Sequence, residues 1–208
     1  MTNRLKEIFT RTCCRNFDTT KTISKDQLKL IMKAGQAAPS AKNRQPYYFI
    51  AILNKDCRKE IADMAQEARK KQFAHLSEED FAKTKIGDTG SNDKSIYEAS
   101  AAILVFRDSD KEYFEADTES EKLNIKEEQG VAVAAYSMML QAEHMGISSG
   151  WICSPLYIKD ELKNILIKYN INFNNNWEPR AIITLGYCSI KPKKPQRIQL
   201  KEKSCIVE

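Results

Sequence analysis

Two segments of this chain carry cationic and polar side chains at spacings that suit the binding of an anion. The first contains Arg11 and Arg15, which are four positions apart and would share one face of a helix that reached that far. A guanidinium group fits phosphate oxygens in a bidentate geometry, and two guanidiniums on one face repel unless an anion or carboxylate lies between them. The competing interpretation is that both arginines are surface residues paired with nearby acids. The packing face of the expected short helix consists of Leu5, Ile8 and Phe9.

The second segment lies between Pro39 and Pro46. Its polar residues include no carboxylate: Ser40, Lys42, Asn43, Arg44 and Gln45. We expect Pro39 to end the preceding helix and Pro46 to hold Gln45 in an extended conformation before a strand. A polar connection fixed at both ends presents a constant set of hydrogen-bond donors, although an ordinary solvated connection fits this segment equally well.

The composition is that of a globular protein with one domain. The chain has 208 residues, of which 42% are hydrophobic and 29% are charged, so it is long enough to bury a substantial core. Its apolar runs are too short to span a membrane, and no signal-peptide pattern follows the first charges. We therefore expect a cytoplasmic protein with no membrane association.

The net charge of +5 does not by itself indicate a nucleic-acid partner. Acidic residues concentrate between positions 108 and 121, and basic residues concentrate between 191 and 203, so no sustained basic face is expected. This amount of clustered positive charge fits a single anionic group, such as one phosphate.

The cysteines and histidines give no metal or disulfide signature. No Cys-x-x-Cys pair is present, so we expect no metal site. A disulfide framework is not expected in a reducing compartment, and we interpret the cysteines as free thiols. These are Cys13, Cys14, Cys57, Cys153, Cys188 and Cys205. His75 and His144 have no recognisable catalytic neighbours and are interpreted as structural.

Apolar patterning predicts an alternation of helices and strands. Helices are expected over 24–38, 56–72, 130–146 and 159–169, and buried strands over 47–53, 101–106 and 180–187. A small-residue turn is expected over 148–155, loops with a short helix over 73–97, and an acidic loop leading into a helix over 108–128. The helix over 130–146 is apolar on every side, so its own domain or a twofold partner must cover it completely.

Four sequence patches occur in a consistent order along nearly the whole chain. They are Arg11-Thr-Cys-Cys-Arg15, Ala38-Pro-Ser-Ala-Lys-Asn-Arg-Gln-Pro-Tyr47, Gly146-Ile-Ser-Ser-Gly-Trp-Ile152, and Leu185-Gly-Tyr followed by Lys194-Pro-Gln-Arg197. On these patches the chain resembles the nitroreductase family of flavin enzymes. The resemblance implies an α+β fold with a central, mostly antiparallel sheet wrapped by helices, in an intertwined homodimer. It also implies one domain over 1–208, in which about 73–128 is a lid or excursion and about 188–208 is a C-terminal arm.

The resemblance further implies where FMN would bind. The phosphate would be held by Arg11, Thr12 and Cys13, with Lys194 and Arg197 on its other side. Arg15 would lie near flavin N1 and O2. The other subunit would line the ring with Pro39, Ser40, Ala41 and Asn43, and backbone contacts near N5 would come from Trp151, Ile152 and Cys153. Cys13, Ala41 and Tyr47 depart from the residues usual in the family, which leaves affinity and substrate open.

The function implied is FMN-dependent transfer of hydride from NAD(P)H, through flavin N5, to a nitroaromatic, quinone or flavin acceptor in a ping-pong cycle. A fixed cation near N1 favours flavin reduction, and Arg15 is the candidate. No side-chain acid or base is expected, and no G-x-G-x-x-G dinucleotide fingerprint is present. Alternatives on the same scaffold are reductive dehalogenation, flavin fragmentation, or flavin binding without catalysis.

Overall fold

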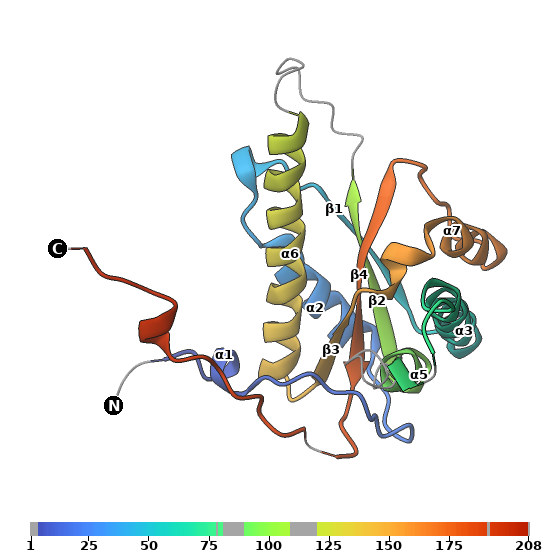
Figure 1. Cartoon of the computed structure of the whole chain (residues 1–208), viewed down its shortest axis with the longest axis horizontal. Helices are drawn as coiled ribbons and strands as arrows, with labels where there is room; N and C mark the ends of the chain where they lie inside the picture. The colour runs from blue at the N-terminus through green and yellow to red at the C-terminus, as the bar shows by residue number, and fades with distance from the viewer. Residues whose placement is uncertain (1–3, 78, 81–89, 109–119, 191, 208) are drawn as a thin grey trace.

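A four-stranded antiparallel sheet forms the middle layer of the protein (Figure 1). The computed structural model describes residues 4–77, 79–80, 90–108, 120–190 and 192–207. The strands are β1 (Tyr47–Ile52), β2 (Ala101–Asp108), β3 (Ser148–Ile152) and β4 (Trp177–Gly186), in the order β1-β2-β4-β3. The two central strands, β2 and β4, are covered on both faces, which explains why their sequences are near-continuous apolar runs.

Helices cover both faces of the sheet. One face packs against α2 (Lys25–Gln36) and α6 (Ser120–His144), and its core includes Ile103, Met138 and Ile183. The opposite face packs against α3 (Lys55–Gln72), α5 (Gly90–Glu98) and α7 (Lys159–Lys168), with a core that includes Leu104, Ile61 and Leu162. Shorter helical pieces are α1 (Lys6–Thr10), η1 (Ala41–Asn43), η3 (Ser154–Tyr157) and η4 (Leu200–Glu202). Among the described residues, no helix combines the length and apolar character that a membrane crossing needs.

Local signals in the sequence account for several element boundaries. The Ser24 hydroxyl accepts the Gln27 N–H and the Gln27 side chain accepts the Ser24 N–H, so α2 begins with a capping box. Asn54 caps α3 through the Cys57 N–H. Gly146 follows α6 with φ of 71°, the left-handed conformation expected of a residue that ends a helix. The expected strands at 47–53, 101–106 and 180–187 are confirmed.

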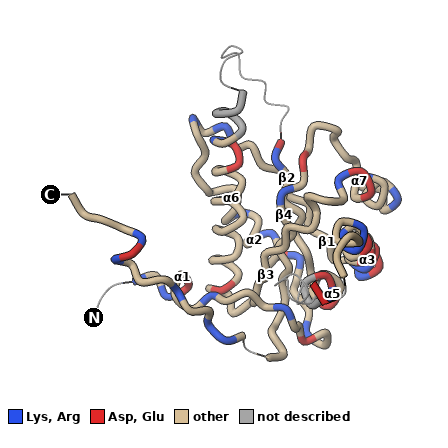
Figure 2. Tube along the Cα trace, in the orientation of Figure 1, with Lys and Arg blue, Asp and Glu red and all other residues tan. Residues whose placement is uncertain are grey.

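Helix α6 is longer than expected and only partly covered. It begins at Ser120 rather than near Gly130, and its middle carries no charged residue (Figure 2). Val133 and Tyr136 on this helix are 41% and 37% exposed, so the chain's own domain does not cover the helix completely, and coverage by a twofold partner stays a prediction. The reason is that the sheet and α2 cover only one side of the helix.

The N-terminal segment also differs from its expectation. Helix α1 ends at Thr10, so Arg11 and Arg15 do not share a helical face. The residues expected to form its packing face are exposed: Leu5, Ile8 and Phe9. The reason is that α1 has only five residues, one and a half turns, and none of them is buried against the domain.

One pair of cysteines is not free. Cys14 and Cys188 form a disulfide with their Cα atoms 6.0 Å apart, which corrects the interpretation of all six cysteines as thiols. Cys13, Cys57, Cys153 and Cys205 are free. The two bonded residues meet because Phe17 forms an antiparallel bridge with Cys188, a contact between distant parts of the chain that Cys spacing does not reveal.

Candidate functional site

The segment containing Arg11–Arg15 runs along the outer edge of β3. The Cys14 N–H donates to the Ser149 carbonyl over 2.9 Å, and Cys13 and Ser149 form a parallel bridge. Gly150 permits this approach, because a Cβ atom there would lie 2.8 Å from the carbonyl oxygen of Cys14. The expected turn over 148–155 is therefore wrong in its first part, which is a strand with a partner on each side.

This arrangement brings two groups of expected site residues together. Arg11, Thr12 and Cys13 are half-buried and Arg15 is exposed. On the adjoining strand, Trp151 is half-buried, Ile152 is buried and Cys153 just beyond is exposed. The Trp151 indole N–H donates to the Cys153 sulfur over 3.2 Å.

Three buried polar atoms in this region have no hydrogen-bond partner within the described structure. They are Arg11 Nε, Ser149 Oγ and Ser154 Oγ. Leaving such an atom unpaired costs about 1–3 kcal/mol, so groups of this kind mark places where a ligand or water completes the structure. Ser149 and Ser154 were not expected as site residues, although Ser149 lies inside the Gly146–Ile152 patch. The Arg11 guanidinium also lies 5.9 Å from the centre of the Tyr136 ring on α6.

The loop between Pro39 and Pro46 has an unusual backbone. Lys42, Asn43 and Gln45 have φ values of 52°, 54° and 53°, in the left-handed region that side chains other than glycine seldom adopt. The extended conformation expected for Gln45 is therefore wrong. The Gln45 N–H donates to Ser40 Oγ over 2.8 Å, and this contact overrides the preference imposed by Pro46. Each left-handed residue costs about 1–2 kcal/mol, so neighbouring elements must hold the loop in place.

The loop lies against the N-terminal half of α6. A Cβ atom on Gly130 would lie 3.3 Å from Ser40 Cβ and 3.6 Å from Pro46 Cγ. Pro39 and Asn43 are exposed, and Ser40 and Ala41 are half-buried. At the other end of α6, the His144 ring bonds Glu7 of α1 over 2.8 Å. From 130 to 144 a helix rises roughly 20 Å, so this loop and the Glu7 contact of α1 lie well apart along α6, with the Arg11 side chain over Tyr136 between them.

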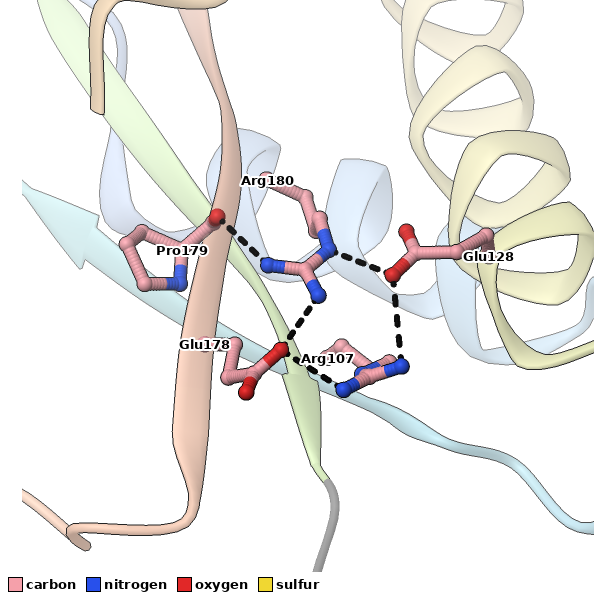
Figure 3. Close-up of polar contacts among 5 residues, drawn as sticks. All are labelled: Arg107, Glu128, Glu178, Pro179 and Arg180. Carbon is pink, nitrogen blue, oxygen red and sulfur yellow. Dashed lines mark hydrogen bonds and ion pairs between the residues drawn. The ribbon is translucent and has the colours of Figure 1, made fainter. Parts of the chain in front are cut away.

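A network of two arginines and two glutamates joins α6 to the sheet beside this loop (Figure 3). Glu128 Oε1 on α6 lies 2.6 Å from Arg180 Nε and 3.5 Å from Arg107 Nη1. Glu178 accepts from Arg107 over 2.6 Å and also pairs with Arg180. The pairing of β2 and β4 shifts between Val105 and Phe106, leaving Arg180 as the extra residue of a bulge that aims it toward Glu128.

The C-terminal tail begins beside the Arg11–Arg15 segment. The Asp18 N–H donates to the Tyr187 carbonyl over 2.7 Å, and the Ser189 N–H donates to the Asn16 carbonyl over 3.0 Å. Lys194 and Arg197 are exposed further along the tail. Their approach to the same anion as Arg11 stays a prediction.

Comparison with known proteins is decisive for the family. The model of the family described as "Nitroreductase family" matches residues 8–187, which is most of the chain. The chain belongs to the nitroreductase family. A curated relative, the "Oxygen-insensitive NADPH nitroreductase" of Helicobacter acinonychis (strain Sheeba), is 36% identical over 52 residues. That match covers only 25% of either protein.

Two solved structures in the nitroreductase and flavoprotein group share the whole fold. A BluB-like flavoprotein of Clostridium difficile 630 has a TM-score of 0.77 at 23% identity, covering 98% of each chain. A nitroreductase with bound FMN from Desulfitobacterium hafniense DCB-2 has a TM-score of 0.75 at 20% identity, covering 100% of each chain. At these identities the likeness establishes the α+β nitroreductase fold.

Proposed function

We propose that this nitroreductase-family protein is an oxidoreductase that binds FMN and transfers hydride from NAD(P)H to a small acceptor. Nitroaromatics, quinones and free flavin are the proposed acceptors. The family membership, the NADPH nitroreductase among the relatives and the FMN bound to one structural neighbour support this activity. No described helix suits a membrane crossing, and we propose a cytoplasmic location.

The observation that carries the proposal is the set of unpaired buried polar atoms along β3. Arg11 Nε, Ser149 Oγ and Ser154 Oγ lie in or next to the segments expected to bind the phosphate and the flavin ring. A phosphate carries about −1.5 to −2 charges near neutral pH and offers several acceptor oxygens, so it suits a cation with an unused donor. The residues present therefore fit FMN, with Arg11, Thr12 and Cys13 at the phosphate.

When bound, FMN supplies a ring that accepts and releases hydride at N5. Arg15 would place a positive charge next to N1 and O2, where it stabilises the electron-rich ring. Backbone groups of Trp151, Ile152 and Cys153 would orient the ring edge near N5. Because nicotinamide and acceptor would use the same pocket in turn, we expect ping-pong kinetics.

We propose that the site is completed by a second copy of the chain. Family members are generally dimeric, and in this chain the Pro39–Pro46 loop touches α6 at Gly130, whereas Arg11 lies over Tyr136 further along the helix. Exposed apolar side chains lie on α1, on α6 and in the tail: Leu5, Phe9, Val133, Tyr136, Ile198 and Leu200. A twofold interface would bury them and bring the partner's loop to the ring.

The test is to purify the protein and measure its visible spectrum, FMN content and mass in solution. We expect a yellow dimer with one FMN per chain that oxidises NAD(P)H when menadione or a nitrofuran is added. Arg11→Ala is expected to raise the dissociation constant for FMN at least tenfold, whereas Arg4→Ala serves as the matched N-terminal control. A colourless protein that takes up no added FMN would overturn the proposal.

A further inference from the structure

Arg44 is a buried cation at the centre of the strained loop. Its side chain is only 6% exposed, and its neighbours Lys42, Asn43 and Gln45 all have left-handed backbones. Arginine is almost never buried in this way unless opposite charge lies nearby. Helix α6, which packs against the loop at Gly130, is one source of such charge.

Glu127 on α6 supplies a carboxylate at this place. It is 4% exposed, and it lies three residues before Gly130, which touches Ser40 and Pro46 of the loop. Burial raises the pKa of the Glu127 carboxyl, and the charges of Arg107 and Arg44 act against that rise. Glu128 and Asp108 act in the same direction as burial. Glu127 thus lies within the electrostatic reach of both the loop and the sheet.

The neighbouring carboxylate, that of Glu128, forms ion pairs with a different group of residues. Glu128 binds Arg180 and Arg107, and Glu178 binds the same two arginines from β4 (Figure 3). Arg107 is therefore paired with two carboxylates that do not belong to the loop. The charges of Arg107 in this network and of Arg44 in the loop both act on Glu127.

We propose that Glu127 is a positioning residue for the flavin, acting through Arg44 to hold the Pro39–Pro46 loop in its left-handed conformation. In that conformation the loop presents Ser40, Ala41 and Asn43 toward the ring of the partner's cofactor. This inference rests on the proposed function for the loop's contact with FMN. The link between Glu127 and Arg44 does not depend on FMN: it rests on the burial of both residues, on the contact of Gly130 with the loop, and on the effect of the Arg44 charge on Glu127.

The experiment uses the full-length protein and Glu127→Gln, which keeps the side-chain shape and removes the charge. One measurement is the rate of trypsin cleavage after Lys42, a site that every variant keeps, in the FMN-free protein, located by mass spectrometry. The other is the dissociation constant for FMN, obtained from flavin fluorescence. We expect at least tenfold faster cleavage in the loop and at least tenfold weaker FMN binding.

Glu128→Gln is the matched control, because it removes the adjacent charge from the other set of partners. It is expected to change both measurements less than threefold. In an Arg44→Gln background, Glu127→Gln is expected to change the cleavage rate and the dissociation constant for FMN by less than a further twofold, because the loop has already lost its cation. Arg44→Gln also provides the second test of the link if Glu127→Gln fails to fold, and it is expected to reproduce the faster cleavage.

Three results would overturn the inference: cleavage within twofold of the wild type, equal effects of the two Gln variants, or full additivity with Arg44→Gln. A wild-type protein that binds no FMN would instead refute the proposed function. In that case the cleavage rates alone decide whether Glu127 holds the loop.

Discussion

Replacing Gly150 with alanine tests whether the Arg11–Arg15 segment depends on close contact with β3. The added methyl group would lie 2.7 Å from Thr184 Oγ1 and 2.8 Å from the carbonyl oxygen of Cys14, where ordinary contacts begin at 3.4 Å. Thr184 is fully buried, and the Cys14 oxygen belongs to the backbone, so neither moves aside easily. The segment must shift by several tenths of an ångström, which strains the 2.9 Å hydrogen bond from Cys14 to Ser149.

The expected loss of unfolding free energy has two parts. Overpacking of a tight contact costs about 1–3 kcal/mol, and loss of the hydrogen bond costs a further 0.5–1.5 kcal/mol or so. Urea unfolding of the FMN-free protein should therefore show a loss of about 1.5–4.5 kcal/mol. FMN binding, measured separately by fluorescence, should weaken at least tenfold because Arg11 and Cys13 move with the segment.

Gly35→Ala is the control for this substitution. Its Cβ would lie 2.8 Å from Cγ and 3.1 Å from the sulfur of the buried Met138, so it tests a tight contact of similar closeness away from the Arg11–Arg15 segment. Alanine also favours the interior of α2 by up to about 1 kcal/mol over glycine. If Gly150→Ala keeps wild-type stability and FMN affinity, the close packing of this segment on β3 is not what forms the site.

Three further substitutions test the stability of the fold. Burial raises the pKa of the Cys57 thiol from 9.0 to about 11, so the unfolded chain loses its proton first and stability falls between pH 9 and 11. Across this pH range, the free energy of unfolding measured with urea should fall by up to about 2.7 kcal/mol more for the wild type than for Cys57→Ala. Arg58→Met should lower the free energy of unfolding by about 2–4 kcal/mol, because the buried guanidinium donates to the carbonyls of Leu53 and Ala99. Lys59→Met, at an exposed position, is the control in the same urea assay. Ser24→Ala should lower the thermal midpoint by removing the capping box of α2, a loss of about 1 kcal/mol.

The sequence predicts best the elements whose signals are local. Neighbouring residues in the sequence create the apolar runs of β1, β2 and β4 and the capping box of Ser24, so these features can be predicted from the sequence. Strand β3 was missed because Ser, Ser and Gly have low strand propensity, and the strand exists through pairing with β4 and the Cys13 segment. The conformation of Gln45 was missed because the Ser40 hydroxyl, five residues away, outweighs the effect of the following proline.

The candidate site is predicted from motifs and not from geometry. The patches identify the segments, and the structure brings Arg11–Cys13 beside Trp151–Cys153. The roles of Ser149 and Arg44 depend on burial and on contacts between distant residues, which single-sequence patterns do not contain. The Arg107–Glu178–Arg180 arrangement depends on a one-residue bulge in β4, which no local sequence motif predicts.

The contacts of the N-terminal segment also set the order in which the site can form during synthesis. Cys14 hydrogen-bonds Ser149 and is bonded to Cys188, and Asn16 accepts from Ser189, so these contacts form after nearly all of the domain has left the ribosome. A pairing of such long sequence separation forms late, after the local helices and hairpins. A nascent chain therefore lacks the contact between the Arg11–Arg15 segment and β3, and if FMN binds at this edge as proposed, we expect it to bind after translation.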